Sequence, residues 1–230
     1  FVAEGVDTVF SLMGDSNMMF QNALVHRHGV RVVNVRHENA AVAMADGYSR
    51  STGRVGVATV TCGPGLTQII TALTAATRLC VPLVVFVGDT PSTDLWNPQE
   101  LDFGATVLPS GARNAPIRSA DRIAETIGLA FLRAKRERRP VVVSMPYDLQ
   151  EHTVSDDFAP TPSSAFGYER AVAHPAPDAV AAAAEILRAA KRPVIVAGRG
   201  AVFADARDAI VSLAERTGAL LATSLKAKEW

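Results

Sequence analysis

The chain has 230 residues, of which 48% are hydrophobic and 20% charged, which is typical of a globular protein of one large domain or slightly more. Lysine plus arginine and aspartate plus glutamate both number 23, so no net field favours nucleic acid or an anionic membrane. No apolar run reaches the roughly 18 residues of a membrane span, and the two cysteines form no disulfide framework or metal-ligand spacing. We expect a reduced, cytoplasmic protein without nucleic-acid or membrane partners.

Short β-branched runs alternate with longer helical patterns along most of the chain. Strands are expected at residues 8–12, 30–35, 55–61, 82–88, 140–145, 193–198 and 219–223. Most of these runs are continuously apolar, as in strands that are covered on both faces. Helices are expected at residues 16–28, 38–50, 64–79, 120–137, 177–190 and 204–217. This repetition predicts an α/β fold, a doubly wound parallel sheet with helices on both faces.

Residues 150–177 interrupt the alternation with prolines, serines and aspartates, which is typical of a linker between domains. We therefore expect a first domain over 1–150, a linker over 151–176 and a second domain over 177–230. The last range holds two strands and two helices, too few to bury a core, so we expect a truncated Rossmann-like domain. The chain also starts without a methionine and ends at Trp230 in mid-pattern, which predicts a fragment of a longer protein.

One carboxylate stands at the edge of an apolar segment. Glu38 follows the strand that ends near Val35 and opens the stretch "ENAAVAMADGY". It shares a helix face with Ala41, Val42 and Ala45. We expect this helix to be buried nearly all round, with Glu38 at the carboxyl edge of the sheet, where such folds bind ligands. Spacing leaves two interpretations open: a carboxylate that exchanges a proton with a ligand, or one that only complements the helix dipole.

Two further turns connect a strand to a helix. In "TCGPGLTQ" (61–68) the glycines allow close backbone approach, and Pro64 suits the first helical turn. The other turn is "SLMGDSN" (11–17). Taken alone, either sequence has an alternative interpretation: a tight strand-to-helix turn that binds no ligand. Because the carboxyl ends of parallel strands meet at one edge, we expect both turns to lie near Glu38.

Taken together, these stretches resemble the N-terminal, pyrimidine-binding domain of thiamine-diphosphate-dependent enzymes of the acetolactate synthase and 2-oxo-acid decarboxylase superfamily. The resemblance is carried by "VFSLMGDSN", "VRHENAAVAMADGYSRSTGRVGVATVTCGPGLT", "PLVVFVGDTP" and "PVVVSMPYDL". The stretches "RPVIVAGRGA" and "LAERTGALLATSLKAKEW" resemble the opening of the central domain of the same family. The resemblance implies a thiamine-diphosphate-binding fold and an enzyme, a lyase or transferase, that decarboxylates or ligates small 2-oxo acids.

The resemblance also implies a role for each candidate residue. Glu38 aligns with the activating glutamate that hydrogen-bonds N1′ of the cofactor pyrimidine, which makes it the candidate catalytic residue. Pro64 and Gln68 align with positions that line the pyrimidine pocket, and Gly14 aligns with the turn that faces it, so all three are candidate cofactor-binding residues. Gln68 replaces the asparagine usual in acetolactate synthases. Gln99 matches a glutamine on the substrate side of the site.

The sequence departs from the family at several points. Pro98 replaces the phenylalanine that usually precedes Gln99, and Ala112 with Arg113 replaces an expected lysine, so the substrate pocket can belong to another decarboxylase or carboligase. The family holds Mg²⁺ and diphosphate on a GDG-type motif of a separate domain, so no metal ligand is expected here and the fragment alone should be inactive. Some members carry FAD in the central domain, so FAD stays a candidate. Active sites between subunits imply a homodimer or homotetramer.

Two other functions stay open. The first is a non-catalytic binding or regulatory module that keeps the fold without the chemistry. The second is a nicotinamide dehydrogenase, but Gly198, Arg199 and Gly200 are followed by Phe203 where the third glycine of the dinucleotide fingerprint would stand. His37 is interpreted as structural, because it diverges from Glu38 by about 100° around the helix.

Overall fold

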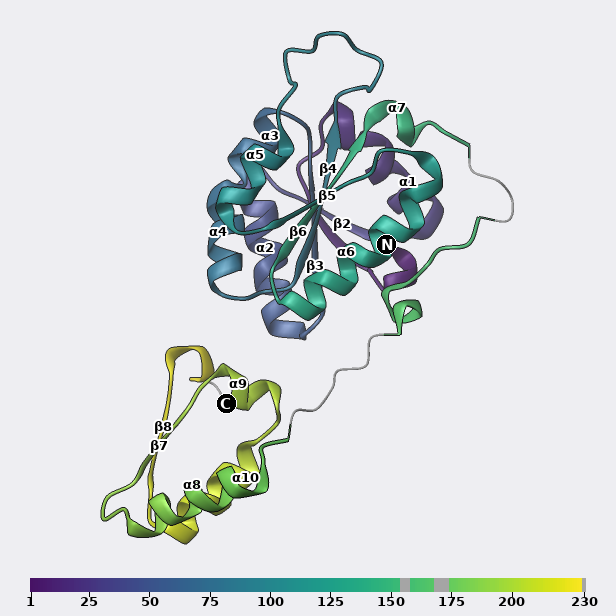
Figure 1. The fold of residues 1–230 in the computed structure, drawn as a ribbon. Helices are drawn as coiled ribbons and strands as arrows, with labels where there is room; N and C mark the ends of the chain where they lie inside the picture. The colour runs from purple at the N-terminus through teal and green to yellow at the C-terminus, as the bar shows by residue number, and fades with distance from the viewer. Residues whose placement is uncertain (154–157, 168–173, 229–230) are drawn as a thin grey trace. The chain divides into compact units, whose positions relative to one another are not determined.

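The computed structural model of the chain describes residues 1–153, 158–167 and 174–228 (Figure 1). Contacts between Cα atoms divide the chain into two compact units, residues 1–169 and 170–230. The expected limits of the two domains and of the linker between them stay a prediction. Each unit is described by itself below.

The first unit is built on a six-stranded, all-parallel sheet with strand order β2-β1-β3-β4-β6-β5 (Figure 1). The strands are β1 (Thr8–Ser11), β2 (Arg31–Asn34), β3 (Gly56–Val60), β4 (Leu83–Asp89), β5 (Arg113–Pro116) and β6 (Pro140–Pro146). The α-helices are α1 (Met18–His28), α2 (Glu38–Thr52), α3 (Pro64–Gln68), α4 (Ile70–Arg78), α5 (Phe103–Val107), α6 (Ile123–Glu137) and α7 (Tyr147–Gln150). The predicted α/β class with a doubly wound parallel sheet is confirmed.

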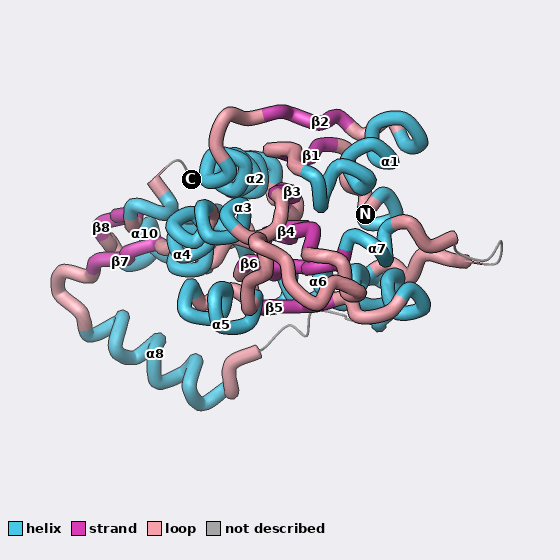
Figure 2. Tube along the Cα trace, turned by 90° about the horizontal axis from the view of Figure 1, so that it is seen from above, coloured by secondary structure: helices cyan, strands magenta, loops and turns pink. Residues whose placement is uncertain are grey.

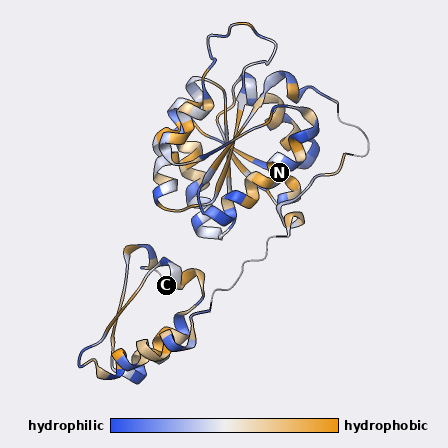
Figure 3. Ribbon diagram, in the orientation of Figure 1, coloured by the Kyte–Doolittle hydropathy of each residue, from blue (hydrophilic) through white to orange (hydrophobic). Residues whose placement is uncertain are grey.

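Helices cover both faces of this sheet, with one hydrophobic core on each side (Figure 2). Successive strand residues point to opposite faces, so Val84 and Phe86 of β4 join the core under α1 and α6. Val85 and Val87 join the core under α2, α3, α4 and α5. Figure 3 shows apolar residues concentrated in the strands, as expected for strands that are covered twice.

Two parts of the first unit differ from the sequence-based expectation. Strand β5 was not expected, because "RNAP" contains no β-branched residue and no apolar run. It is the edge strand of the sheet, where the missing N–H of Pro116 removes no central ladder bond. The helix expected over 64–79 is divided into α3 and α4. At the division, the N–H of Ile69 bonds the carbonyl of Leu66, three residues back, so the chain tightens locally into a 3₁₀ turn.

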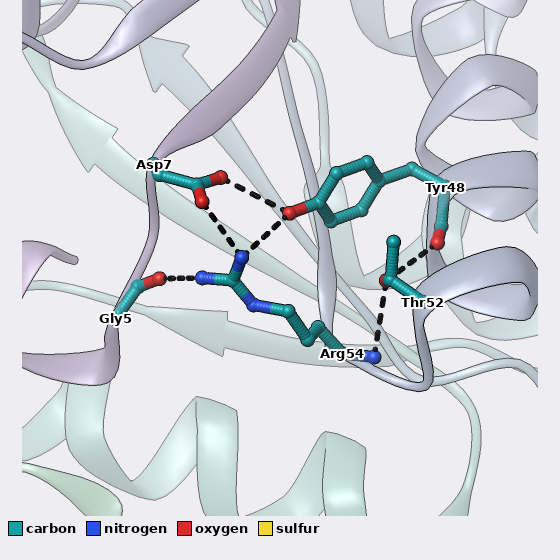
Figure 4. A network of polar contacts seen from close by, with 5 residues as sticks. All are labelled: Gly5, Asp7, Tyr48, Thr52 and Arg54. Atoms are coloured by element: carbon teal, nitrogen blue, oxygen red, sulfur yellow. Dashed lines mark hydrogen bonds and ion pairs between the residues drawn. The ribbon is translucent and has the colours of Figure 1, made fainter.

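The amino edge of the sheet is tied together by a polar network (Figure 4). Arg54, just before β3, donates hydrogen bonds to the carboxylate of Asp7 at 2.7 Å, to the hydroxyl of Tyr48 at 3.0 Å and to the carbonyl of Gly5. Tyr48 of α2 donates to the other carboxylate oxygen of Asp7 at 3.0 Å. The guanidinium, followed by the Tyr48 hydroxyl, lowers the pKa of Asp7 to about 2.

The second unit contains a two-stranded parallel sheet with helices. Its elements are α8 (Pro177–Ala189), β7 (Val194–Ala197), α9 (Arg199–Phe203), α10 (Arg207–Thr217) and β8 (Leu220–Thr223). The large strand residues Val196 and Leu220 are exposed by 65% and 67%. Among its described residues, the buried hydrophobic ones are alanines, as expected for a segment too short to bury a core, although it has the helix α9 in addition to the two that were expected.

None of the helices that the structure describes combines the length and the apolar character needed to cross a membrane.

The network at the amino edge predicts how Asp7 titrates. The pKa of Asp7 is expected near 2 in the folded protein, and Arg54→Gln should return it towards 3.8, because the guanidinium bond is the largest cause of the shift. Carbon-13 NMR of the Asp7 carboxyl against pH measures this. Tyr48→Phe, which removes the second bond only, should move the pKa less.

The same shift has a consequence for stability. The folded-state pKa of Asp7 lies below the ordinary value of 3.8, so the stabilisation is present above that pH and is lost as the pH falls towards 2. The free energy of unfolding of wild type and Asp7→Asn, measured in urea, should therefore differ most at neutral pH and converge in acid. A difference that stays constant from pH 7 to pH 2 would contradict this assignment.

Candidate functional site

The turns expected to bind a ligand lie side by side at the carboxyl edge of the sheet, because β2, β1 and β3 are neighbours. Ser11 at the end of β1 is in register with Asn34 of β2 and Thr59 of β3, so three adjacent strands end at nearly the same level. The chain passes from β1 outward to β2, whereas β3 leads to β4 on the other side. Such a reversal of strand order is the usual position of a ligand crevice in an open α/β sheet.

The structure places the predicted site residues on these turns. Gly14 precedes the 3₁₀ turn η2 (Asp15–Asn17), Glu38 begins α2, and Pro64 begins α3. Gln99 lies in the loop between β4 and α5, which projects from the same edge (Figure 1). Topology therefore brings these four to one edge of the sheet. Gln68 ends α3, one helical turn beyond Pro64, and its side chain is exposed.

Glycines let the turns touch one another. A Cβ atom on Gly14 would lie 2.6 Å from the Cβ of Thr61, in the turn after β3. A Cβ atom on Gly63 would lie 2.7 Å from the carbonyl oxygen of Gln99, and Gly63 also has a φ of +55° that residues with a side chain rarely adopt. A side chain at Gly14 would push the turn after β1 away from the turn after β3, and one at Gly63 would push the turn after β3 away from the loop of Gln99.

The buried hydroxyl of Ser16 is the centre of the polar contacts between these turns. It lies 2.9 Å from the hydroxyl of Thr61 and accepts a hydrogen bond from the N–H of Cys62 at 2.9 Å. The carbonyl of Ser16 accepts from the side chain of Gln150 at 2.6 Å. The neighbouring Asn17 is fully buried and ties the same turn to β3 through its side-chain amide.

Sequence reasoning did not identify this set of residues. A signal was present, because serine and asparagine in "GDSN" are residue types that hydrogen-bond backbone and side-chain groups in turns. The partners in "TVTCGPG" lie more than 40 positions away, and only the strand order brings them together.

Helix α2 is buried on one side rather than nearly all round, which corrects the expectation from its composition. Ala41, Val42 and Ala45 are fully buried, whereas Met44, outside this face of the helix, is 41% exposed. Glu38 is half-buried at the boundary. The helix covers one face of the sheet, and its small apolar residues do not mean that a second side of the helix is also packed. Water therefore reaches the region of Glu38 in this chain.

The residues on both sides of Glu38 fix the start of α2. His37 is the N-cap, and its Nδ1 accepts a hydrogen bond from the N–H of Asn39 at 3.1 Å, a contact that supports the interpretation of His37 as structural. The Oδ1 of Asn39 accepts from the N–H of Ala72 in the first turn of α4 at 2.9 Å. No hydrogen bond or ion pair engages the Glu38 carboxylate within the part of the chain that the structure describes.

Gln99 is bound to the turn after β3. The thiol of the buried Cys62 donates to its side-chain oxygen Oε1 at 3.3 Å, and its own N–H donates to the side chain of Asn97 at 3.0 Å. The loop and the predicted cofactor turn therefore meet at one point.

A titratable carboxyl group lies farther along the same edge, at the end of β4. Burial raises the pKa of Asp89, and its hydrogen bond from the N–H of Thr90 at 2.8 Å opposes this effect. Asp89 lines a cavity of about 340 Å³ with Asn114 and Ser144, between the carboxyl ends of β4, β5 and β6. In residues 1–153, 158–167 and 174–228, no three or more His, Cys, Asp or Glu side chains are grouped to hold a metal ion.

Comparison with known proteins gives two family matches. The N-terminal TPP binding domain of thiamine pyrophosphate enzymes matches residues 1–105, and the central domain of the same enzymes matches residues 180–230. Together, the two matches cover more than half of the chain.

Curated relatives match nearly the whole chain. A probable acetolactate synthase large subunit of Methanococcus aeolicus is 33% identical over 98% of this chain and 38% of its own length. A probable 2-ketoarginine decarboxylase of Pseudomonas aeruginosa is 37% identical over 97% of this chain and 40% of its own length. A probable acetolactate synthase large subunit of Methanocaldococcus jannaschii is 32% identical over 98% and 39%. The chain thus spans about two fifths of the length of these relatives.

The contacts of Ser16 predict a loss of stability in Ser16→Ala. The substitution leaves the N–H of Cys62 buried without its hydroxyl partner, which should cost about 1–3 kcal/mol in the free energy of unfolding. Urea unfolding followed by circular dichroism measures the loss. The matched control is Ser164→Ala, because Ser164 is exposed, and its value should stay within about 0.5 kcal/mol of wild type. Equal stabilities of both variants would contradict the role of Ser16.

Proposed function

We propose a function from one premise: the chain belongs to the family of thiamine pyrophosphate enzymes. The protein that contains it binds thiamine diphosphate and acts on a small 2-oxo acid, by decarboxylation, carboligation or both. Mg²⁺ joins the diphosphate through residues outside this chain, and the assembled enzyme is at least a homodimer. The family resemblance supports the Mg²⁺ site and the homodimer. On the same ground, FAD stays a candidate ligand of the second unit.

The residues at the carboxyl edge fit the aminopyrimidine ring of the cofactor by their chemistry. A ring nitrogen and its exocyclic amine need hydrogen-bonding partners, and a flat ring needs apolar or backbone surfaces. The edge offers the carboxylate of Glu38 together with the glycine-rich turns after β1 and β3. When bound, thiamine diphosphate supplies an electron sink for breaking or making a carbon–carbon bond next to a carbonyl.

The position of Glu38 is the observation that carries this proposal. It is the first residue of α2, the helix that connects the edge strand β2 to β3, and its neighbours His37 and Asn39 both make hydrogen bonds that fix the start of this helix. Glu38 would hold the proton or strong hydrogen bond at the pyrimidine N1′. Gly14 and Pro64 would form the walls of the ring site. The exposed Gln68 would contact the ring from the end of α3.

One observation favours a decarboxylase or carboligase that differs from acetolactate synthase. The lysine expected from the resemblance is replaced by Ala112 and Arg113. Ala112 is buried, and Arg113 begins β5 at the amino edge, where its guanidinium pairs with Glu137 at 2.6 Å. Neither residue brings a cation to the carboxyl edge. The similarity to a probable 2-ketoarginine decarboxylase is consistent with such a different substrate pocket.

The test uses the protein expressed from its complete reading frame, with thiamine diphosphate and Mg²⁺. Carbon dioxide release is measured with pyruvate and, separately, with 2-ketoarginine, and at least one of the two should be decarboxylated. Glu38→Gln should lower kcat by about 10²–10⁴-fold, because the carboxylate that holds the proton is replaced by an amide. The melting temperature should stay near that of wild type, because His37 and Asn39 hold the helix start without Glu38.

The matched control is Glu151→Gln, a loss of one exposed carboxylate in the same unit, which should leave kcat unchanged. Calorimetric titration with thiamine diphosphate and Mg²⁺ gives a second readout. Wild-type rates in Glu38→Gln on every accepted substrate would remove Glu38 from the mechanism. A wild-type protein that does not bind the cofactor would leave a non-catalytic module as the function.

A further inference from the structure

The contact between Cys62 and Gln99 joins two segments that are far apart in sequence. Cys62 follows β3 and is 2% exposed, and Gln99 lies in the projecting loop after β4. The thiol donates to Oε1 of Gln99 at 3.3 Å, within the range of a hydrogen bond to sulfur. Gly63, the next residue, has no Cβ atom and so leaves room for the backbone of Gln99.

This contact determines which end of the Gln99 amide faces Cys62. A side-chain amide is planar, with an accepting oxygen at one end and a donating NH₂ group at the other. The thiol is a weak donor and a weak acceptor, and in this structure its proton goes to the oxygen, Oε1. Oε1 is therefore turned towards the buried Cys62, and Nε2 is turned away from it.

The rest of Gln99 is held as well. Its N–H donates to Oδ1 of Asn97 at 3.0 Å, and the Asn97 side-chain amide donates to the carboxylate of Asp94 at 2.9 Å. Two hydrogen bonds within the loop therefore hold its backbone at Gln99. Cys62 is itself held in place, because its backbone N–H donates a hydrogen bond to the hydroxyl of Ser16 at 2.9 Å. Backbone and side chain of Gln99 are thus both fixed relative to the turn after β3.

We propose that Cys62 is a positioning residue, which orients the Gln99 amide so that its NH₂ group binds an acceptor on the substrate. The inference rests on the proposed function, because a 2-oxo acid carries a carboxylate and an adjacent carbonyl, and both are acceptors. A bond from an NH₂ group to a carboxylate is charge-assisted and is stronger than one between neutral groups. An amide turned the other way would present its oxygen and repel the carboxylate.

The experiment measures substrate binding separately from cofactor binding in the complete protein with thiamine diphosphate and Mg²⁺. Cys62→Ala removes the donor, so the amide is free to turn, and the KM for the accepted 2-oxo acid should rise about tenfold. Cys62→Ser keeps a donor at nearly the same place and should recover most of this loss. The dissociation constant of thiamine diphosphate should stay within about twofold of wild type, because the Cys62 thiol bonds the side chain of Gln99 and is not itself assigned to the cofactor.

A double-mutant cycle shows whether Cys62 acts through Gln99. Gln99→Met removes the amide, so adding Cys62→Ala to it should raise KM no further. Calorimetric titration with oxamate, which carries a carboxylate beside a carbonyl, gives the same comparison without turnover. Cys80→Ala is the matched control, because it removes the other thiol, which lies at the end of α4 away from this edge, and it should leave KM unchanged.

The outcomes separate this inference from the proposed function. A wild-type protein without turnover of any 2-oxo acid would contradict the proposed function itself. An active wild type in which Gln99→Met raises KM but Cys62→Ala does not would overturn the positioning role alone. Additive effects in the double variant, or an equal loss in Cys62→Ser and Cys62→Ala, would show that Cys62 contributes packing rather than orientation.

Discussion

The close contact between the turn after β1 and the turn after β3 is the constraint on which the carboxyl edge depends. Gly14 allows the contact, and the hydroxyl of Ser16 makes it specific by bonding both Thr61 and the N–H of Cys62. Because Cys62 is held there, the loop of Gln99 has a fixed point to bind. One buried hydroxyl therefore connects the ends of two strands to a loop that begins at a third.

Glu38 is more accessible to water than the apolar composition of α2 suggested. Small apolar residues form the buried face of α2, but Met44 outside this face is 41% exposed and Glu38 is half-buried. A hydrogen bond to a carboxylate is stronger where water is excluded. The low dielectric that suits the proposed chemistry would therefore have to come from the bound ring or from a second subunit, rather than from this helix alone.

The strands, the long helices and the position of Glu38 could be predicted from the sequence, because β-branched runs and apolar periodicity report local structure directly. Strand β5 could not, since "RNAP" has no such pattern and forms a strand only beside β6. The bonds of Ser16 and of Gln99 could not either, because they join distant segments. The resemblance indicated Gln99 as a site residue, but not that a cysteine holds it.

The start of α2 has an evolutionary consequence. His37 and Asn39 secure the backbone, while the carboxylate between them is spared from that task. If Glu38 has the proposed role, folding and chemistry are assigned to different side chains within three consecutive positions. Replacement of the middle one would leave a folded protein that is open to selection for another use, whereas replacement of either neighbour would first have to be tolerated by the fold. Gene duplicates of such a domain can drift towards binding roles in a single step.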